Sequence, residues 1–278
     1  MVQIISLGLG VQSTALYFMS SMGKIPRADY AIFSDTGREA TATYDYLQFL
    51  QEWKEQHNGI PLVVLQDRNL YTDLLSTGIN GRFTSIPAYT ANEDGSVGML
   101  RRQCTGEYKI VLVDNYIRDH IYQLPKGARR PRTAIWHGIT LDESGRMSNP
   151  AEAWKVNTYP FLGRSMDKSG NISRIIWAVP ATRREIRHWY VLQGLPIPPK
   201  SSCVFCPYQS DQAWALKKKH SPDDFAAAVA VDNAIRNSTE KGIFNPVYLH
   251  RSCRPLADVT FDVSQEESWG ECSGHCHV

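Results

Sequence analysis

Short apolar runs alternate with amphipathic stretches at the beginning of the chain. Residues 1–7, 30–34 and 61–65 are apolar runs of the kind found in buried strands. Between them, residues 12–22 and 40–57 carry apolar side chains at helical spacing. Because strands and helices alternate, we predict an α/β fold: a Rossmann-like parallel sheet with helices on both faces.

The pattern is less regular further along the chain. Residues 77–101 are rich in Gly, Ser, Thr and Asn and predict a long loop. Residues 107–122 return to helical spacing. Residues 133–139 and 174–179 are further strand candidates, and we expect the stretch between them to be irregular.

The organisation changes near residue 180. We expect a helix after Pro180 to about Gln193, and two more helices that reach about residue 237. A proline-rich turn and a cysteine loop lie between the first of these helices and the other two. The prediction is therefore an α/β domain over residues 1–180, followed by a C-terminal helical and irregular segment over residues 181–278 that carries cysteines.

Composition and charge exclude some classes of protein. The chain has 278 residues, 42% of them hydrophobic, and a formal net charge of only +2, which is typical of a globular protein without a nucleic-acid-coated surface. Three local basic clusters stand out, at 129–132, 183–184 and 217–219. Such clusters are usually solvated faces, and nucleic-acid contact is the alternative.

No apolar stretch approaches the roughly 20 residues of a membrane span. The N-terminus also lacks the pattern of a signal peptide, so we expect a cytoplasmic protein that does not act at a membrane. In that compartment the six cysteines favour metal binding or redox chemistry over a disulfide framework.

A glycine loop follows the first predicted strand. It reads Gly8-Leu9-Gly10-Val11-Gln12-Ser13-Thr14 and leads into the first predicted helix. Glycines there allow backbone amides to approach phosphate oxygens, and a helix N-terminus favours an anion. The loop has neither the third glycine of the dinucleotide fingerprint nor the lysine of a Walker A loop. By itself it is also compatible with a plain strand-to-helix turn.

The second predicted strand ends at Asp35-Thr36-Gly37, where ligands bind in open α/β sheets. Together the two loops resemble those of the adenine nucleotide alpha-hydrolase-like (PP-loop) superfamily. The superfamily includes ATP pyrophosphatases and the sulfonucleotide (PAPS and APS) reductases. The resemblance implies that ATP, PAPS or APS is the ligand, with magnesium where pyrophosphate leaves. Gln12 and Leu9 stand where the superfamily has an acidic residue and a glycine.

This resemblance assigns the ligand contacts residue by residue. The phosphates would be held by Gly8, Gly10, Gln12, Ser13 and Thr14. The adenosine would be bordered by Asp35, Thr36 and Gly37, with Asp35 also a candidate catalytic residue. Gly138 and Arg146 belong to a stretch resembling the Gly-x-x-x-Asp-Glu-x-x-x-Arg segment of the reductases, and Arg146 is a candidate phosphate ligand. A surface turn is the simpler interpretation of that stretch.

Cys203-Val-Phe-Cys206 is the most specific chemical motif in the chain. Two thiolates two residues apart can bind one metal ion or one cluster. Cys104 precedes Lys109 in a manner that resembles the cluster-containing APS reductases. The resemblance implies that Cys104, Cys203 and Cys206 ligate one [4Fe–4S] cluster, with zinc as the rival.

The fourth ligand is open. It could be Cys253, Cys272 or Cys276, or be absent, as in tRNA thiolation enzymes of the superfamily that hold a cluster by three cysteines. Cys272 lies in a tail, 271–276, that resembles the Glu-Cys-Gly-x-His ending of the reductases. It is therefore a candidate nucleophile, a candidate metal ligand with Cys276, or part of an irregular tail.

Three functional hypotheses follow. The first is an ATP-using, iron–sulfur-dependent sulfurtransferase, supplied by a sulfur donor such as a cysteine desulfurase or thioredoxin, with a nucleic acid as a possible acceptor. The second is a PAPS or APS reductase with Cys272 as nucleophile. The third is a non-catalytic nucleotide-binding module stapled by zinc.

Overall fold

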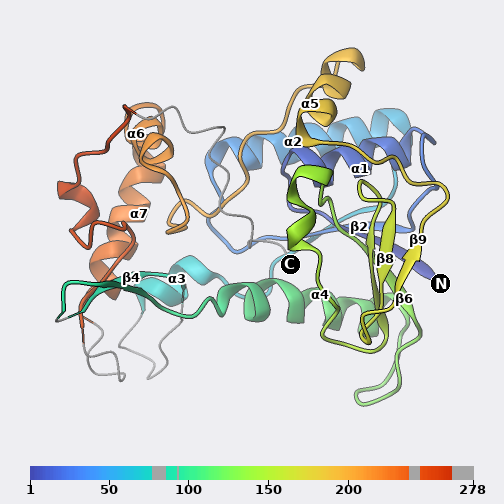
Figure 1. Ribbon diagram of the computed structural model, residues 1–278, viewed down its shortest axis with the longest axis horizontal. Coiled ribbons are helices and arrows are strands. Elements are labelled where there is room, and N and C mark those ends of the chain that lie inside the picture. The colour runs from blue at the N-terminus through green and yellow to red at the C-terminus, as the bar shows by residue number, and fades with distance from the viewer. Residues whose placement is uncertain (77–85, 93, 238–244, 265–278) are drawn as a thin grey trace.

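The computed structural model describes residues 1–76, 86–92, 94–237 and 245–264 (Figure 1). Its centre is a seven-stranded sheet in the order β3-β2-β1-β6-β7-β8-β9. These strands are β1 (Val2–Ser6), β2 (Tyr30–Ser34), β3 (Leu62–Leu65), β6 (Thr133–Trp136), β7 (Lys155–Tyr159), β8 (Arg164–Met166) and β9 (Ile172–Arg174). The first five strands in this order, from β3 across to β7, are parallel to one another. Strands β8 and β9 pair antiparallel at the other edge.

Helices cover both faces of this sheet, which confirms the predicted Rossmann-like α/β fold. On one face lie α1 (Val11–Ser21), α2 (Thr41–His57) and α5 (Arg183–Leu192) (Figure 1). On the other face lies a continuous helical stretch with π-helical ends: η1 (Gly106–Ile110), α4 (Val111–Tyr116) and η2 (Ile117–Ile121). No helix in the described ranges is long and apolar enough to cross a membrane.

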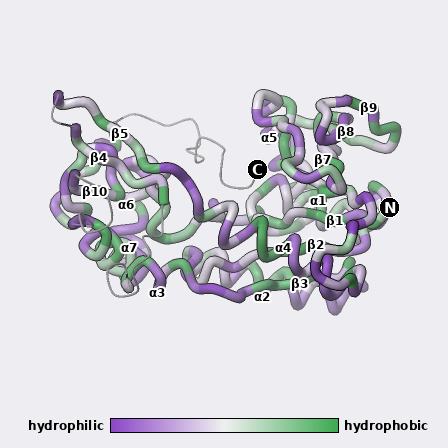
Figure 2. The backbone as a smooth tube through the Cα atoms, turned by 90° about the horizontal axis from the view of Figure 1, so that it is seen from below, coloured by the Kyte–Doolittle hydropathy of each residue, from purple (hydrophilic) through white to green (hydrophobic). Residues whose placement is uncertain are grey.

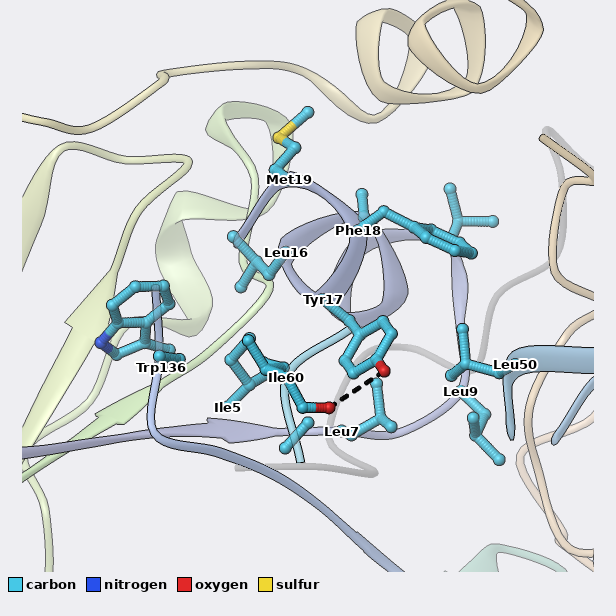
Figure 3. Close-up of a cluster of buried hydrophobic side chains, with 14 of the residues drawn as sticks. Ile5, Leu7, Leu9, Leu16, Tyr17, Phe18, Met19, Leu50, Ile60 and Trp136 are labelled. Carbon is cyan, nitrogen blue, oxygen red and sulfur yellow. Dashed lines mark hydrogen bonds between the residues drawn. The ribbon is translucent and has the colours of Figure 1, made fainter. Parts of the chain in front are cut away.

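The central strands are apolar because both of their faces are covered. Ile4 and Ile5 in β1 point to opposite faces, and both are fully buried. Ile5 packs in the larger core, beneath α1, with the aromatic side chains of that helix (Figure 3). The one polar group among them, the Tyr17 hydroxyl, donates to the carbonyl of Ile60 at 3.1 Å. The core on the α1 face of the sheet is thus apolar, and the Tyr17 hydroxyl within it is satisfied.

Two predictions about irregular segments were wrong. The predicted loop over 77–101 contains an antiparallel hairpin of β4 (Tyr89–Ala91) and β5 (Val97–Met99), extended by β10 (Val247–Tyr248). Residues 77–85 and 93 lie outside the described part. The stretch predicted to be irregular before residue 174 contains β7, β8 and β9, and only the first residue of the predicted strand 174–179 is in a strand.

A second hydrophobic core lies beyond the carboxyl ends of the strands (Figures 1 and 2). It is built from α3 (Leu70–Leu75), α6 (Asp211–His220), α7 (Pro222–Ile235) and segments within 86–108 and 203–261. Helix α5, which follows residue 180, packs instead in the first core through Ile186 and Tyr190. The chain therefore enters the second core twice, before and after β6.

Asp224 of α7 joins the second core to the sheet domain. Its carboxylate accepts hydrogen bonds from the backbone nitrogen and the hydroxyl of Thr41, both at 2.9 Å, at the first turn of α2. We expect Asp224→Ala to lower the free energy of unfolding by about 1–3 kcal/mol, because the two donors of Thr41 lose a buried, charged acceptor. Chemical denaturation measures this, with the exposed neighbour Asp223→Ala as control. Equal effects of the two changes would contradict the assignment.

Candidate functional site

The glycine loop closes on itself at the carboxyl end of β1. Gly10 has the extended backbone of an N-cap, and Leu9 adopts a left-handed conformation with φ of 56°. The Ser13 hydroxyl accepts a hydrogen bond from the nitrogen of Gly8 at 3.1 Å. Helix geometry leaves the first amides of α1 without intrahelical partners. The predicted loop residues therefore surround a helix N-terminus suited to an anion.

The loop after β6 lies against this helix N-terminus. A Cβ on Gly138 would lie 2.7 Å from the nitrogen of Ser13 and 2.9 Å from the carbonyl carbon of Gln12. Only glycine permits this approach. Since β1 lies between β2 and β6, the two loops meet where the strand order reverses, which is where open α/β sheets bind ligands.

Gln12 and Arg146 converge on one carboxylate. Glu143, in the short helix η3 (Leu141–Arg146), accepts from Gln12 Nε2 at 2.7 Å and from Arg146 Nη1 at 2.7 Å. The structure thus brings the predicted Arg146 to the glycine loop, but already paired. The hydroxyl of Thr14 is buried in α1 and has no hydrogen-bond partner among the described residues. Glu143 was part of the sequence motif without being singled out.

The Asp-Thr-Gly segment forms a tight turn after β2. Asp35 Oδ1 accepts from the nitrogen of Gly37 at 2.7 Å and from the Tyr44 hydroxyl at 2.9 Å. Gly37 has φ of +94°, and a Cβ there would lie 2.3 Å from Asn69 Cγ. This oxygen of Asp35 therefore shapes the turn, a role that sequence reasoning did not assign to it.

The Cys-x-x-Cys loop is docked onto the residues that follow this turn. Glu39 and Cys203 form an antiparallel bridge, flanked by a hydrogen bond from the nitrogen of Val204 to the carbonyl of Arg38 at 3.1 Å. The Cys203 sulfur lies 3.0 Å from the Thr36 hydroxyl oxygen. The two predicted motifs, far apart in sequence, are in direct contact at the carboxyl end of β2.

Lys109 places a positive charge among the thiols. Its ammonium lies 3.9 Å from Glu39 Oε1, which is buried. Burial alone lowers the pKa of Lys109, but Glu39 and the thiols of Cys203, Cys104 and Cys206 raise it by more. All three predicted cysteine ligands therefore influence the pKa of one lysine.

Burial disfavours the ionised form of these thiols. Burial raises the pKa of Cys203 well above its ordinary value and also raises those of Cys206 and Cys104. Lys217 of α6 fixes their loop by donating to the Val204 carbonyl and, at 2.6 Å, to Gln209 Oε1. Sequence reasoning did not identify Lys217, because it lies in a run of three lysines that is typical of a solvated face.

The donor chemistry and the donor geometry differ in what they say about a metal. Three thiols near one lysine are the donor set of a thiolate-bound metal or cluster. Within the described ranges, however, no group of three or more His, Cys, Asp or Glu side chains is arranged to hold a metal ion. Cys253 lies near the same region, since both Cys253 and Cys206 raise the pKa of Tyr89 in addition to its burial. The predicted Cys272, with Cys276, lies outside the described residues.

A cavity of about 350 Å³ lies on the α4 face of the sheet, and Leu7 and Thr105, which directly precede Gly8 and follow Cys104, line it. Lys109 lines it at the thiols, and His137 lines it beside Gly138. Its walls are largely apolar, with Ser34 and Asn157 among the polar groups. Its size lies in the range of small-molecule sites. His137 and Asn157 were not predicted, because Asn157 lies in a stretch expected to be irregular.

His137 is a neutral imidazole in the folded protein. Burial lowers its pKa to about 4, opposed by the hydrogen bond with Asn157 Oδ1 at 3.2 Å. Because the folded pKa is below the unfolded value of about 6.5, stability is present above that pH and is lost as pH falls towards 4. We expect His137→Gln to remove about 1–2 kcal/mol of the stability loss between pH 7 and pH 5. Parallel denaturation at both pH values measures this, and identical losses in both proteins would contradict it.

Comparison with known proteins adds no relative to this description. The chain matches no model of a known protein family, and a search of curated proteins finds no significant match.

Proposed function

We propose that the chain binds an adenine nucleotide at the carboxyl edge of its sheet and uses it for sulfur chemistry, as an ATP-using, iron–sulfur-dependent sulfurtransferase. The observation that carries the proposal is the contact between Cys203 and Thr36, with 3.0 Å between sulfur and oxygen. It puts the Cys-x-x-Cys loop beside the turn after β2. Residues beside both, Leu7 before the glycine loop and Lys109 next to the thiols, line one cavity.

The nucleotide contacts are assigned from the start of α1 and from the cavity. The phosphates lie at the amides that begin α1, where the helix dipole favours negative charge. The adenosine occupies the apolar cavity, whose size suits it. Glu143 would hold magnesium, which prefers carboxylate and water oxygens, because Gln12, its hydrogen-bond partner, offers no carboxylate. Asp35 holds the turn that borders the nucleotide.

The remaining residues prepare the thiol end. Cys104, Cys203 and Cys206 would hold an iron–sulfur cluster, which when bound supplies an iron site for sulfide. Lys109 offsets the negative charge that deprotonated thiols and a phosphate bring together. Lys217 keeps the loop in place by its hydrogen bond to Gln209. The apolar cavity wall limits access of water to the reacting groups.

Anaerobic purification followed by iron, sulfide and zinc analysis tests the thiol end of the proposal. We expect about four irons per chain and a broad absorption band near ~400 nm, as cysteine-bound clusters give. Cys206→Ser should lose iron, whereas Cys253→Ser tells whether Cys253 is the fourth ligand. One zinc and no iron in the wild type would contradict the cluster and favour the zinc-stapled module.

Titration calorimetry with ATP, APS and PAPS tests the nucleotide end. Preference for ATP supports the sulfurtransferase. Failure to bind any of the three would contradict the proposal as a whole.

A PAPS or APS reductase is the second candidate, and Gln12 favours it. A reductase does not cleave pyrophosphate, so it has no need of an acidic residue in the glycine loop, and Gln12 supplies none. On this hypothesis Cys272 attacks the sulfur of the bound sulfonucleotide. Cys272→Ser should then abolish thiol-dependent sulfite release, with Cys276→Ser as control. Full activity of Cys272→Ser would eliminate Cys272 as nucleophile.

A further inference from the structure

A basic groove lies at the amino ends of β6 and β7, away from the second core. It has a volume of about 840 Å³ and is bordered by the end of the α4 stretch, the loop 127–132, the residues just before β7 and the turn 167–169. The loop before β6 extends from the sheet on the side opposite α6 and α7 (Figure 1). The thiol and phosphate motifs, at the carboxyl ends of the strands, do not line it.

The cations of this groove are largely uncompensated. Arg129, Arg130, Arg132 and Lys168 line it, and none of them forms an ion pair with another described residue. Arg129 and Arg132 are exposed to solvent. Arg118, the remaining arginine, is paired with Asp119. These side chains give one face a concentration of positive charge that the net charge of +2 conceals.

The acidic residues of the groove, Asp114, Glu152 and Asp167, offset only part of this charge. The carboxylate of Asp114 is 2.6 Å from Lys155 Nζ. Asp167 Oδ1 accepts hydrogen bonds from the nitrogens of Ser169 and Asn171, so it is turned into its own loop. Glu152 is exposed. The groove therefore keeps an excess of cations that are free to meet phosphates.

Trp154 adds an aromatic surface to the groove. The Arg130 guanidinium carbon lies 4.9 Å from the centre of the Trp154 ring, and Trp154 is only partly buried. Arginines that follow a backbone beside an aromatic ring are the two elements with which proteins bind nucleic acid strands without reading sequence. A membrane surface would require several large apolar side chains around the cations, and besides Trp154 the groove offers only Val111 and two alanines.

We propose that this groove binds the phosphate backbone of a nucleic acid, with Arg129, Arg130 and Arg132 as its phosphate contacts. Asp114 lines both the groove and the cavity of about 350 Å³, and its pairing with Lys155 stands between them. A strand in the groove therefore lies beside the nucleotide cavity. The inference rests on the proposed function in one respect: it makes the nucleic acid the sulfur acceptor.

Fluorescence anisotropy with labelled single-stranded DNA, single-stranded RNA and duplex DNA tests the groove. The variant is the triple replacement Arg129→Glu, Arg130→Glu and Arg132→Glu. The matched control is the triple replacement Lys218→Glu, Lys219→Glu and Arg254→Glu. It changes the net charge by the same amount, but on exposed residues at the surface of the part of the molecule that holds the second core. Replacing the three arginines by lysine keeps the charge and should retain binding.

The expected result is a loss of at least about tenfold in affinity for the groove variant alone. The slope of log affinity against log salt should also become shallower by about 2–3, close to one for each lost phosphate contact. Equal losses in the variant and the control would overturn the proposal. So would wild-type protein that binds vesicles of anionic lipid but none of the nucleic acids.

Calorimetry with ATP on the same variants separates this inference from the proposed function. ATP affinity should be unchanged in the groove variant, which also shows that the variant is folded. ATP binding without nucleic-acid binding would contradict the proposed role of the groove and leave the nucleotide site standing. Nucleic-acid binding without ATP, APS or PAPS binding would leave the groove and sink the proposed function.

Discussion

Gly138→Val should weaken ATP binding by about tenfold to hundredfold while the sheet stays folded. The new Cβ would sit 2.7 Å from the nitrogen of Ser13 and 2.9 Å from the carbonyl carbon of Gln12. Both atoms belong to the backbone at the start of α1 and cannot rotate away. The helix N-terminus must therefore move from the loop after β6. Overpacking of this kind costs about 1–3 kcal/mol, which is the source of the expected range.

Titration calorimetry with ATP measures the effect, and Gly145→Val is the matched control. Gly145 lies in the neighbouring helix η3, and a Cβ there would meet no atom within 4 Å. The control should keep wild-type affinity. Equal weakening in both variants would show that the nucleotide does not depend on the contact between Gly138 and α1.

Lys109→Met should be the most destabilising single change in the thiol region. Glu39 is 1% exposed, its Oε1 lies 3.9 Å from the Lys109 ammonium, and its Oε2 has no hydrogen-bond partner among the described residues. Methionine fills a similar volume but leaves this carboxylate uncompensated. Breaking a buried ion pair on one side costs about 3–5 kcal/mol.

The double variant Lys109→Met, Glu39→Gln isolates the cause. Removing both charges costs far less than removing one, because no buried charge is left alone. We therefore expect the double variant to recover most of the lost free energy of unfolding in urea denaturation. A double variant as unstable as Lys109→Met would mean that Lys109 stabilises the region by packing instead of by charge.

The sequence predicted the parts of the fold whose side chains are uniformly apolar. The runs of β1 and β2 are covered on both faces, and β3 is equally apolar although it lies at the edge of the sheet and is only partly buried. Strand β7 escaped prediction although it is as buried as β2. Its Asn157 and Thr158 are polar, and the Asn157 amide is satisfied by the Ser148 carbonyl and by His137. Such tertiary partners cannot be read from local pattern.

The candidate site shows the same division. Glycines and cysteines can be recognised as candidate site residues from the sequence, because few other residues provide their backbone freedom or their sulfur. Glu39, Glu143 and Lys217 do not, since charged residues are common on any surface. Their importance comes from burial beside the motifs, which depends on how the second core docks. The interleaving of segments around that core has no local signature in the sequence.

This interleaving also sets an order of events on the ribosome. Cys104 and Lys109 are made about a hundred residues before Cys203 and Cys206, and the second core needs segments from both regions. At translation rates of about 5–20 residues per second, Cys104 is made about 5–20 seconds before its partners exist. Loading of the thiol centre must therefore follow the emergence of α6 and α7.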